Sequence, residues 1–469
     1  MRLDRTIGDQ ANLRALPQVQ RLLESPLAAS LQTHASRPVL LGALRAVLDQ
    51  ARAQLRADPA LVAPTVETLL AAASDHIAAS DRPGLRRVIN ATGIVLHTNL
   101  GRAPLAQAAL DAVVEAGRGY GNLEFDLAAG HRGSRTQGIE PLLVELTGAE
   151  AALAVNNAAA AVLLALSALA GGGGGEVIVS RGELVEIGGG FRIPDVIRQG
   201  GARLVEVGTT NKTRIADYAD AITPQTRMLL KVHQSNYRIT GFTAEASIPE
   251  LSVLAKAHGL VLMHDLGSGA LVDLRRFGRP YEPTVQEALA AGADLVAFSG
   301  DKLMGGPQAG MLVGNRAAVD PLRRHPLLRA VRLDKMSLAA LEATLRLYRD
   351  PEAAIAQVPA LRMLAQDQAT LAARAGRLHA ALDGVVAVGN EPSTGFAGGG
   401  TLPDTVIPSH AVTLHSDSIP PEQLAMRLRL HHPAVVGRLA GGQLLLDMLT
   451  VSDDELPELA AAIRAVLHS

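Results

Sequence analysis

The chain of 469 residues predicts an α/β fold in which a mainly parallel, doubly wound sheet follows a helical N-terminal domain and precedes a small α+β C-terminal domain. Short apolar runs alternate with helix-like segments from about residue 151 to residue 312, which is the pattern of consecutive βαβ units. Residues 1 to about 87 look helical, and helix-forming residues dominate again between residues 337 and 382. We therefore expect a first domain at residues 1–87, a large domain at 88–335 and a small domain at 336–469.

The N-terminal region is expected to be helical. Residues 16–23 predict a first helix, and residues 39–55 predict a longer amphipathic one. Residues 1–90 hold 11 arginines and 8 acidic residues. This slight positive excess fits ordinary solvated helix faces as well as it fits RNA binding.

The first strand of the sheet is predicted at residues 151–155, and a helix-forming run begins at Ala158. A strand-to-helix junction leaves free N–H groups that point at an anion. Asn157, Ala158 and Ala159 are therefore candidate ligands of a phosphate group. The pair Asn156 and Asn157 is equally well explained as an ordinary helix N-cap.

A later apolar run, residues 259–264, predicts a buried strand that ends in Asp265. A carboxylate at this position can keep the ring nitrogen of pyridoxal phosphate protonated, which makes the ring an electron sink. Asp265 is equally suited to binding the amides of the glycine-containing turn that follows it.

Lys302 is the most informative residue, because the chain has 5 lysines against 39 arginines. A lysine retained against that bias suggests a function that a guanidinium cannot perform, and attack on an aldehyde to form a Schiff base is the main one. Lys302 follows the strand-like run 294–298, and strand ends are where α/β enzymes place their chemistry. Ser299 could donate a further hydrogen bond to the phosphate. Taken singly, Lys302 is equally an exposed surface lysine and Ser299 a turn former.

Together, these residues occur in the order phosphate site, pyridine-pairing acid and Schiff-base lysine, each at the end of an apolar strand. That order favours a pyridoxal-phosphate enzyme of the aspartate-aminotransferase fold type, fold type I. The cofactor expected is pyridoxal 5′-phosphate.

The C-terminal domain is expected to contain short strands after the glycine-rich residues 395–400 and a last helix at residues 454–467. The net charge of −2 and the pI near 6.7 give no global attraction to RNA, so any nucleic-acid contact must be local. The charged N-terminal residues and the lack of a long apolar run favour a cytoplasmic protein. The absence of cysteine excludes disulfides, thiolate metal sites and an enzyme that carries sulfur or selenium on a cysteine, and we expect no metal.

Long motifs occur along most of the chain, at residues 88–104, 120–126, 180–189, 231–242, 299–302 and 328–335. In these motifs and in the Asp265 turn, the chain resembles the bacterial selenocysteine synthases, which are L-seryl-tRNA(Sec) selenium transferases. The resemblance implies conversion of L-seryl-tRNA(Sec) to L-selenocysteinyl-tRNA(Sec), through β-elimination of the seryl hydroxyl to an aminoacrylyl intermediate and addition of selenium from selenophosphate. It also implies a tRNA-recognising N-terminal domain and a cytoplasmic homodecamer built as a pentamer of dimers.

The chemistry of the cofactor and the fold type also assign roles to individual residues. Lys302 would remove the α-proton, and Asp301 would move protons or serve only as a turn residue. His233 and Asn236 would lie near the cofactor ring, although His233 is equally a core histidine.

For selenophosphate, the resemblance implies Arg102, Arg329 and Arg332, because a guanidinium matches phosphate oxygens with two parallel hydrogen bonds. Most arginines of so arginine-rich a chain form ion pairs instead. Arg329 and Arg332 would share one face if their segment is helical.

Two other functions fit the same residues. The first is a related pyridoxal-phosphate lyase or dehydratase that acts on a free amino acid or its phosphorylated form. The second is a catalytically silent RNA-binding or scaffold protein, although such a protein has no need of Lys302, Asp265 and Ser299 together.

Overall fold

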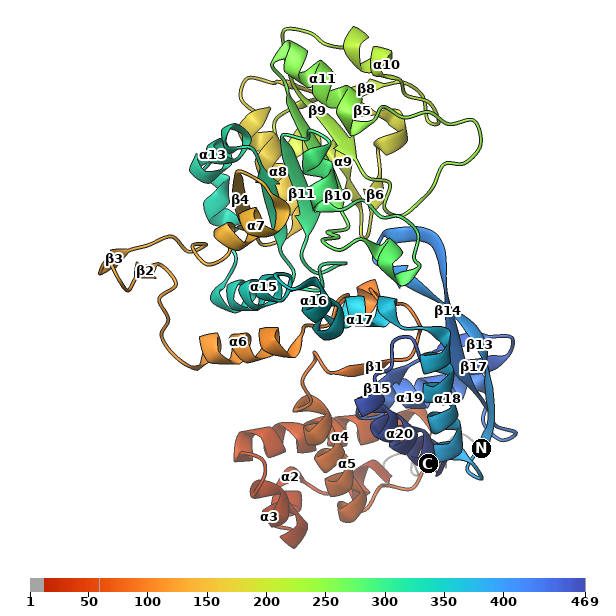
Figure 1. The fold of residues 1–469 in the computed structure, drawn as a ribbon. Coiled ribbons are helices and arrows are strands. Elements are labelled where there is room, and N and C mark those ends of the chain that lie inside the picture. Colours follow the sequence, from red (N-terminus) through yellow and green to blue (C-terminus); the bar gives the residue numbers. More distant parts are fainter. Residues whose placement is uncertain (1–11, 59, 469) are drawn as a thin grey trace, which may run out of the picture. The chain divides into compact units, whose positions relative to one another are not determined.

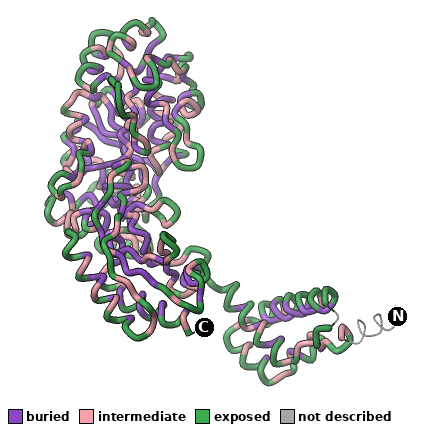
Figure 2. Tube along the Cα trace, turned by 90° about the vertical axis from the view of Figure 1, so that its right-hand side faces the viewer, coloured by how far each residue is buried: buried purple, intermediate pink, exposed green. Residues whose placement is uncertain are grey.

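The computed structural model describes residues 12–58 and 60–468, and the chain divides into two compact units, residues 1–87 and 88–469. The first unit is helical, as predicted (Figure 1). Leu40, Leu44 and Leu48 recur at helical spacing and are buried against Leu69 and Ala73, and Figure 2 shows buried positions along these helices. The helices of this unit include α2 (Val19–Leu23), α3 (Pro26–Gln32), α4 (Arg37–Ala57) and α5 (Val66–Ser80).

The larger unit is built on a seven-stranded sheet with the strand order β4-β12-β11-β10-β9-β5-β8. All pairings are parallel except those of β12 with its two neighbours. Every residue of β4, β5, β11 and β12 is buried, as expected for strands covered on both faces. The strands are β4 (Ala151–Val155), β5 (Glu176–Ser180), β8 (Arg203–Val207), β9 (Thr226–Val232), β10 (Val261–Gly267), β11 (Leu295–Ser299) and β12 (Gly310–Gly314).

Helices cover both faces of this sheet, so the predicted doubly wound arrangement is confirmed (Figure 1). One face packs against α8 (Ala158–Leu169), α9 (Ile193–Gln199) and α13 (Arg316–Arg324). The other packs against α7 (Glu140–Thr147), α11 (Ile248–His258) and α12 (Val285–Ala290). The remaining helices of this region are α10 (Ile215–Asp220) and α14 (Leu327–Ala330).

The direction of the strands determines where a site can form. Because β4, β10 and β11 are parallel, their carboxyl ends meet at one edge, together with the start of the antiparallel β12. The carboxyl ends of β5 and β9 continue the same edge. In open α/β sheets, this edge is where ligands bind.

The C-terminal part differs from the prediction in one respect. Besides the expected short strands, it has the long antiparallel strands β13 (Ala387–Gly398) and β14 (Thr401–His415), and residues 398–401 close the hairpin between them. Strand β13 contains many polar and glycine residues, so its sequence does not show the apolar pattern of a strand. Pairing with β14 supports this strand more than burial does. The other elements are α15 (Lys335–Leu347), α16 (Pro351–Gln357), α17 (Pro359–Ala365), α18 (Gln368–Leu382), α19 (Pro421–Leu430), β15 (Ala434–Val436), β16 (Arg438–Ala440), β17 (Gln443–Asp447) and α20 (Leu456–His468).

The start of the second unit runs along this C-terminal part. Strand β1 (Val88–Asn90) pairs with β15, and Val95 and Leu96 donate backbone hydrogen bonds to Phe396 and Ala397. The chain then reaches Arg102, α6 (Gln107–Arg118) and a hairpin of β2 (Phe125–Asp126) and β3 (His131–Arg132) that stands away from the sheet (Figure 1). None of the helices in the described ranges is both long and apolar enough to cross a lipid bilayer.

Candidate active site

A cavity of about 330 Å³ lies at the carboxyl edge of the sheet. Its walls come from the carboxyl ends of β10 and β11, from the segments that follow β4, β5 and β11, from the turn that precedes β12 and from the loop of Arg102. The lining residues are Arg102, Asn157, Ala158, Ala159, Val162, Ile187, Gly188, Phe191, Asp265, Gly267, Ser299, Asp301, Lys302 and Gln308.

Lys302 is the nucleophile candidate of this cavity. It follows β11 in a turn and is only 6% exposed. Burial lowers the pKa of its amine, and the Arg102 guanidinium acts in the same direction, whereas the carboxylates of Asp265 and Asp301 oppose the shift. The Nζ atom of Lys302 lies near the carboxyl end of β10. A Cβ atom built on Gly267, the last residue of that strand, would be 3.9 Å from this Nζ atom. A lowered pKa increases the fraction of neutral amine, which is the form that attacks an aldehyde.

Asp265 is held near the end of β10, between β9 and β11, where its backbone pairs with Val232 and Ala297. Burial raises the pKa of this carboxyl to about 6, while the charges of Lys302 and His233 oppose the rise. A carboxylate kept from water in this way gains from a cationic partner. A pyridinium N–H is such a partner.

The start of α8 forms the anion-binding side of the cavity. The side chain of Asn157 accepts a hydrogen bond from the N–H of Ala160 at 2.8 Å, so Asn157 is the N-cap of this helix. The N–H groups of Ala158 and Ala159 have no acceptor within the helix, because they belong to its first turn. They line the cavity together with Ser299. This arrangement suits a phosphate group, which the positive end of the helix dipole also stabilises.

Arg102 and Asp301 form an ion pair at the cavity wall, with 2.6 Å between Nη1 and Oδ2. The backbone supports this pairing, since the N–H of Ala103 donates to the carbonyl of Asp301. Arg102 adopts a left-handed conformation with φ of 62°. A non-glycine residue held in this conformation carries local strain, which is common at functional sites.

His233 and Asn236 do not line the cavity, and their predicted contact with the cofactor stays a prediction. His233 lies just after β9, donates its backbone N–H to the carbonyl of Asp265, and has its Nε2 3.3 Å from Oε1 of the buried Glu282. Asn236 is exposed and donates its side-chain N–H to the carbonyl of Glu186 at 2.8 Å.

Arg329 and Arg332 also lie outside this cavity. Helix α14 ends at Ala330, so Arg329 is helical and Arg332 is not, and the two do not share a helix face. Arg329 is exposed, and Nη1 of Arg332 lies 3.6 Å from Glu124 in a separate cleft. Their role toward selenophosphate stays a prediction.

No role was predicted from the sequence for the hairpin of β6 (Glu186–Ile187) and β7 (Phe191–Arg192), which supplies Ile187, Gly188 and Phe191 to the cavity. Strands of two residues leave no periodic pattern to detect. The rarity of aromatic residues could have drawn attention to Phe191, because the chain has only 6 phenylalanines and no tryptophan.

The lining fits pyridoxal phosphate. Lys302 can bind its aldehyde carbon, Asp265 its ring nitrogen, and the start of α8 its phosphate, while Val162, Ile187 and Phe191 offer apolar surface to the ring. The buried carboxyl of Asp265 in particular would gain a partner in the ring N–H.

Comparisons with known proteins agree with this geometry. The family profile described as L-seryl-tRNA selenium transferase matches residues 88–452. A second profile, described as selenocysteine synthase N terminal, matches residues 13–52.

Individual relatives are similar over nearly the whole chain. An L-seryl-tRNA(Sec) selenium transferase from Geobacter sulfurreducens is 51% identical over 96% of this chain and 98% of its own length. The protein of the same name from Hyphomonas neptunium is 50% identical over 97% of this chain and 98% of its own length. Among solved structures, a D-glucosaminate-6-phosphate ammonia-lyase superposes with a TM-score of 0.56 at 22% identity, over 82% of this chain and 96% of that one, so the two share a fold.

Proposed function

The chain belongs to the L-seryl-tRNA selenium transferase family, and on this premise we propose that it converts L-seryl-tRNA(Sec) to L-selenocysteinyl-tRNA(Sec) with pyridoxal phosphate as its cofactor. The observation that carries the proposal is the cavity in which the buried Lys302 and Asp265 lie beside the start of α8. An RNA-binding or scaffold protein needs none of these groups in one place.

When bound, the cofactor supplies an electron sink that acidifies the α-carbon of an attached amino acid. Lys302 takes the α-proton, and its lowered pKa suits this role because the amine must be neutral to act as a base. Asp265 would keep the proton on the ring nitrogen. The N–H groups of Ala158 and Ala159 and the hydroxyl of Ser299 would hold the phosphate.

The seryl hydroxyl needs a proton to leave as water. Lys302 carries one after it has taken the α-proton, and Asp301 lies beside it on the same wall. We assign Asp301 to this proton transfer. Arg102, now paired with Asp301, offers two parallel N–H donors to an oxygen anion, and we assign it to selenophosphate.

The assembly and the tRNA contact belong to the same proposal. We assign recognition of the tRNA to the helical unit of residues 1–87, and selenophosphate contacts also to Arg329 and Arg332. Tyr120 and Leu127, after α6, are 111% and 75% exposed, which favours a homo-oligomer that covers them. The family resemblance supports a cytoplasmic decamer.

The test is the absorbance spectrum of the cofactor-loaded protein during addition of seryl-tRNA(Sec), with free serine, phosphoserine and other amino acids in parallel. Of these additions, we expect only the charged tRNA to change the spectrum. Selenocysteinyl-tRNA should form when selenophosphate is then added. A response to a free amino acid, with none to the tRNA, would identify a small-molecule lyase instead.

A further inference from the structure

The β6–β7 hairpin forms one wall of the cofactor cavity. Ile187, Gly188 and Phe191 line the cavity from this hairpin, and Phe191 is the only aromatic residue among the described lining residues. A planar, partly charged ring needs both apolar surface and polar groups around it. The place of the hairpin therefore decides how well the cavity encloses its ligand.

The hairpin has little internal support. Its two strands pair Glu186 with Arg192 and Ile187 with Phe191, and an exposed ion pair, with 2.6 Å between Nε of Arg192 and Oε2 of Glu186, adds little to this. The turn between them consists of Gly188, Gly189 and Gly190, with open space around all three. A hairpin this short is marginal by itself, so contacts from elsewhere must fix its position.

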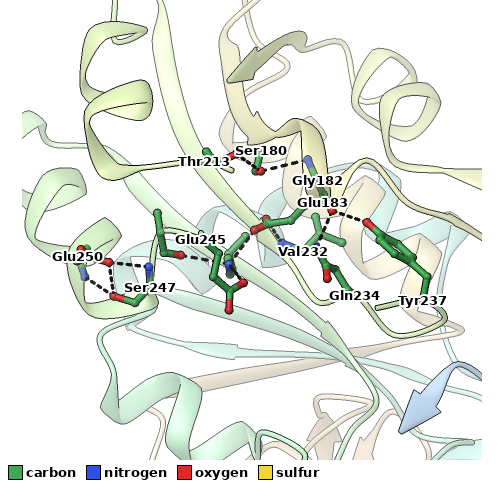
Figure 3. A network of polar contacts seen from close by, with 12 residues as sticks. Ser180, Gly182, Glu183, Thr213, Val232, Gln234, Tyr237, Glu245, Ser247 and Glu250 are labelled. Carbon is green, nitrogen blue, oxygen red and sulfur yellow. Dashed lines mark hydrogen bonds and ion pairs between the residues drawn. The ribbon is translucent and has the colours of Figure 1, made fainter. Parts of the chain in front are cut away.

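The segment that follows β9 supplies these contacts. Nε2 of Gln234 donates to the carbonyl of Gly182 at 2.7 Å, and the hydroxyl of Tyr237 donates to the same carbonyl (Figure 3). Nδ2 of Asn236 donates to the carbonyl of Glu186, the first residue of the hairpin, at 2.8 Å. Three side chains of residues 234–237 thus bind the backbone that leads into the hairpin.

A buried ion pair fixes the base of this arrangement. Nζ of Lys231 lies 2.7 Å from Glu183, 3.0 Å from Glu245 and 3.1 Å from the carbonyl of Ala246, so its three N–H donors meet three acceptors. The other carboxylate oxygen of Glu183 accepts the backbone N–H of Val232 at 2.9 Å (Figure 3). Although burial opposes the charge, the two carboxylates raise the pKa of Lys231, so the amine stays protonated. Lys231 is also one of only 5 lysines in the chain, and a guanidinium could not replace this compact three-way contact.

The same segment is hydrogen-bonded to the acid that lines the cavity. The backbone N–H of His233 donates to the carbonyl of Asp265 at 2.9 Å. Residues 231–237 therefore connect the pyridine-pairing acid to the hairpin wall. Their geometry sets the spacing between the two.

We propose that Lys231, Gln234, Asn236 and Tyr237 are positioning residues that hold the β6–β7 hairpin as the cover of the cofactor site. This inference rests on the proposed function, because it takes pyridoxal phosphate as the ligand. It gives Asn236 a role that acts through Glu186 and the hairpin and needs no contact with the cofactor.

The experiment compares Asn236→Ala, Tyr237→Phe and their double variant with the unchanged full-length protein. Asn236→Ala removes the hydrogen bond to Glu186 of the hairpin, and Tyr237→Phe removes one to Gly182 in the segment that leads into it; neither leaves a buried charge. The readouts are the dissociation constant of pyridoxal phosphate and the induced circular dichroism of the bound cofactor, beside the midpoint of thermal unfolding without cofactor. We expect a roughly fivefold weaker cofactor affinity for each single variant and a larger loss for the double variant. The induced dichroism should fall while the unfolding midpoint stays.

Asn211→Ala is the matched control. Asn211 is also exposed, and its Nδ2 donates to a backbone carbonyl, that of Phe242, at 2.7 Å, without touching the hairpin. We expect it to leave cofactor affinity and dichroism unchanged. Equal effects of Asn211→Ala and Asn236→Ala would overturn the proposal, since any loop hydrogen bond would then serve as well.

A further double variant tests the ion pair without leaving a buried charge. Lys231→Met combined with Glu183→Gln removes both charges, whereas either change alone leaves an unpaired buried group that endangers folding. We expect the folded double variant to lose cofactor affinity and dichroism together. If the unchanged protein binds no pyridoxal phosphate, the proposed function fails. If it binds and none of these variants alters affinity or dichroism, only the positioning role fails.

Discussion

At the level of single residues, Lys302 combines burial, a lowered pKa and a place on the cavity wall. We expect Lys302→Ala to abolish the covalent attachment of the cofactor and to lower turnover at least about 10³-fold, because both a nucleophile and a base are lost. The absorbance spectrum and a single-turnover assay with seryl-tRNA(Sec) measure the two effects. Lys256→Ala, on the exposed side of α11, is the control and should change neither. Turnover at the normal rate in Lys302→Ala would disprove its assignment.

Asp265 illustrates how a functional carboxyl lowers stability. Burial raises its pKa from 3.8 to about 6. Between these two pH values, the cofactor-free folded protein therefore keeps a proton on Asp265 that the unfolded chain has released. Stability must therefore fall as the pH rises from about 4 to about 6, and above that range the penalty is at most about 3 kcal/mol. We expect Asp265→Asn to raise the unfolding midpoint of the cofactor-free protein near pH 7.5 and to leave it unchanged near pH 4. A pH-independent difference in urea or thermal unfolding would contradict this account.

At the level of elements, the phosphate side of the cavity depends on how closely β12 approaches the start of α8. A Cβ built at Gly310 would lie 2.1 Å from the carbonyl oxygen of Asn157 and 2.7 Å from the nitrogen of Ala158. We expect Gly310→Ala to displace the first turn of α8, to cost about 1–3 kcal/mol of stability and to weaken pyridoxal phosphate binding. Equilibrium dialysis and unfolding measure both. Gly172→Ala, in a turn with open space around it, is the matched control. Equal behaviour of the two variants would show that the close approach is unimportant.

The elements also show what a sequence can and cannot disclose. The strands at residues 151–155 and 295–299 were predictable, because strands that are buried on both faces are continuous apolar runs. Lys302, Asp265 and Ser299 could be placed at one edge because parallel strands share their carboxyl ends. The position of the β6–β7 hairpin could not be predicted, because the hydrogen bonds from residues 234–237 that hold it leave no local pattern in the sequence. The long strand β13 was missed because its pairing with β14 outweighs its polar, glycine-containing composition.

At the level of the whole molecule, all the described residues that line the cavity belong to the second unit, and none lies in residues 12–58 or 60–87. Each cavity-lining residue lies within residues 88–469, and the first unit packs its own core from α4 and α5. Cofactor binding should therefore not depend on the first unit. Recognition of a large RNA, by contrast, needs a surface that the cavity does not provide.

A truncated protein without residues 1–80 lacks everything up to the end of α5. We expect its cofactor absorbance and cofactor affinity to be unchanged. Its affinity for seryl-tRNA(Sec) should fall at least about tenfold. Electrophoretic mobility shift or filter binding measures the RNA affinity, and a spectrophotometric titration measures the cofactor affinity. Because contacts to phosphates depend on salt, both proteins must be compared at the same ionic strength. Unchanged tRNA affinity in the truncated protein would refute the assignment of tRNA recognition to residues 1–87. Loss of cofactor binding would instead show that the two units are not independent.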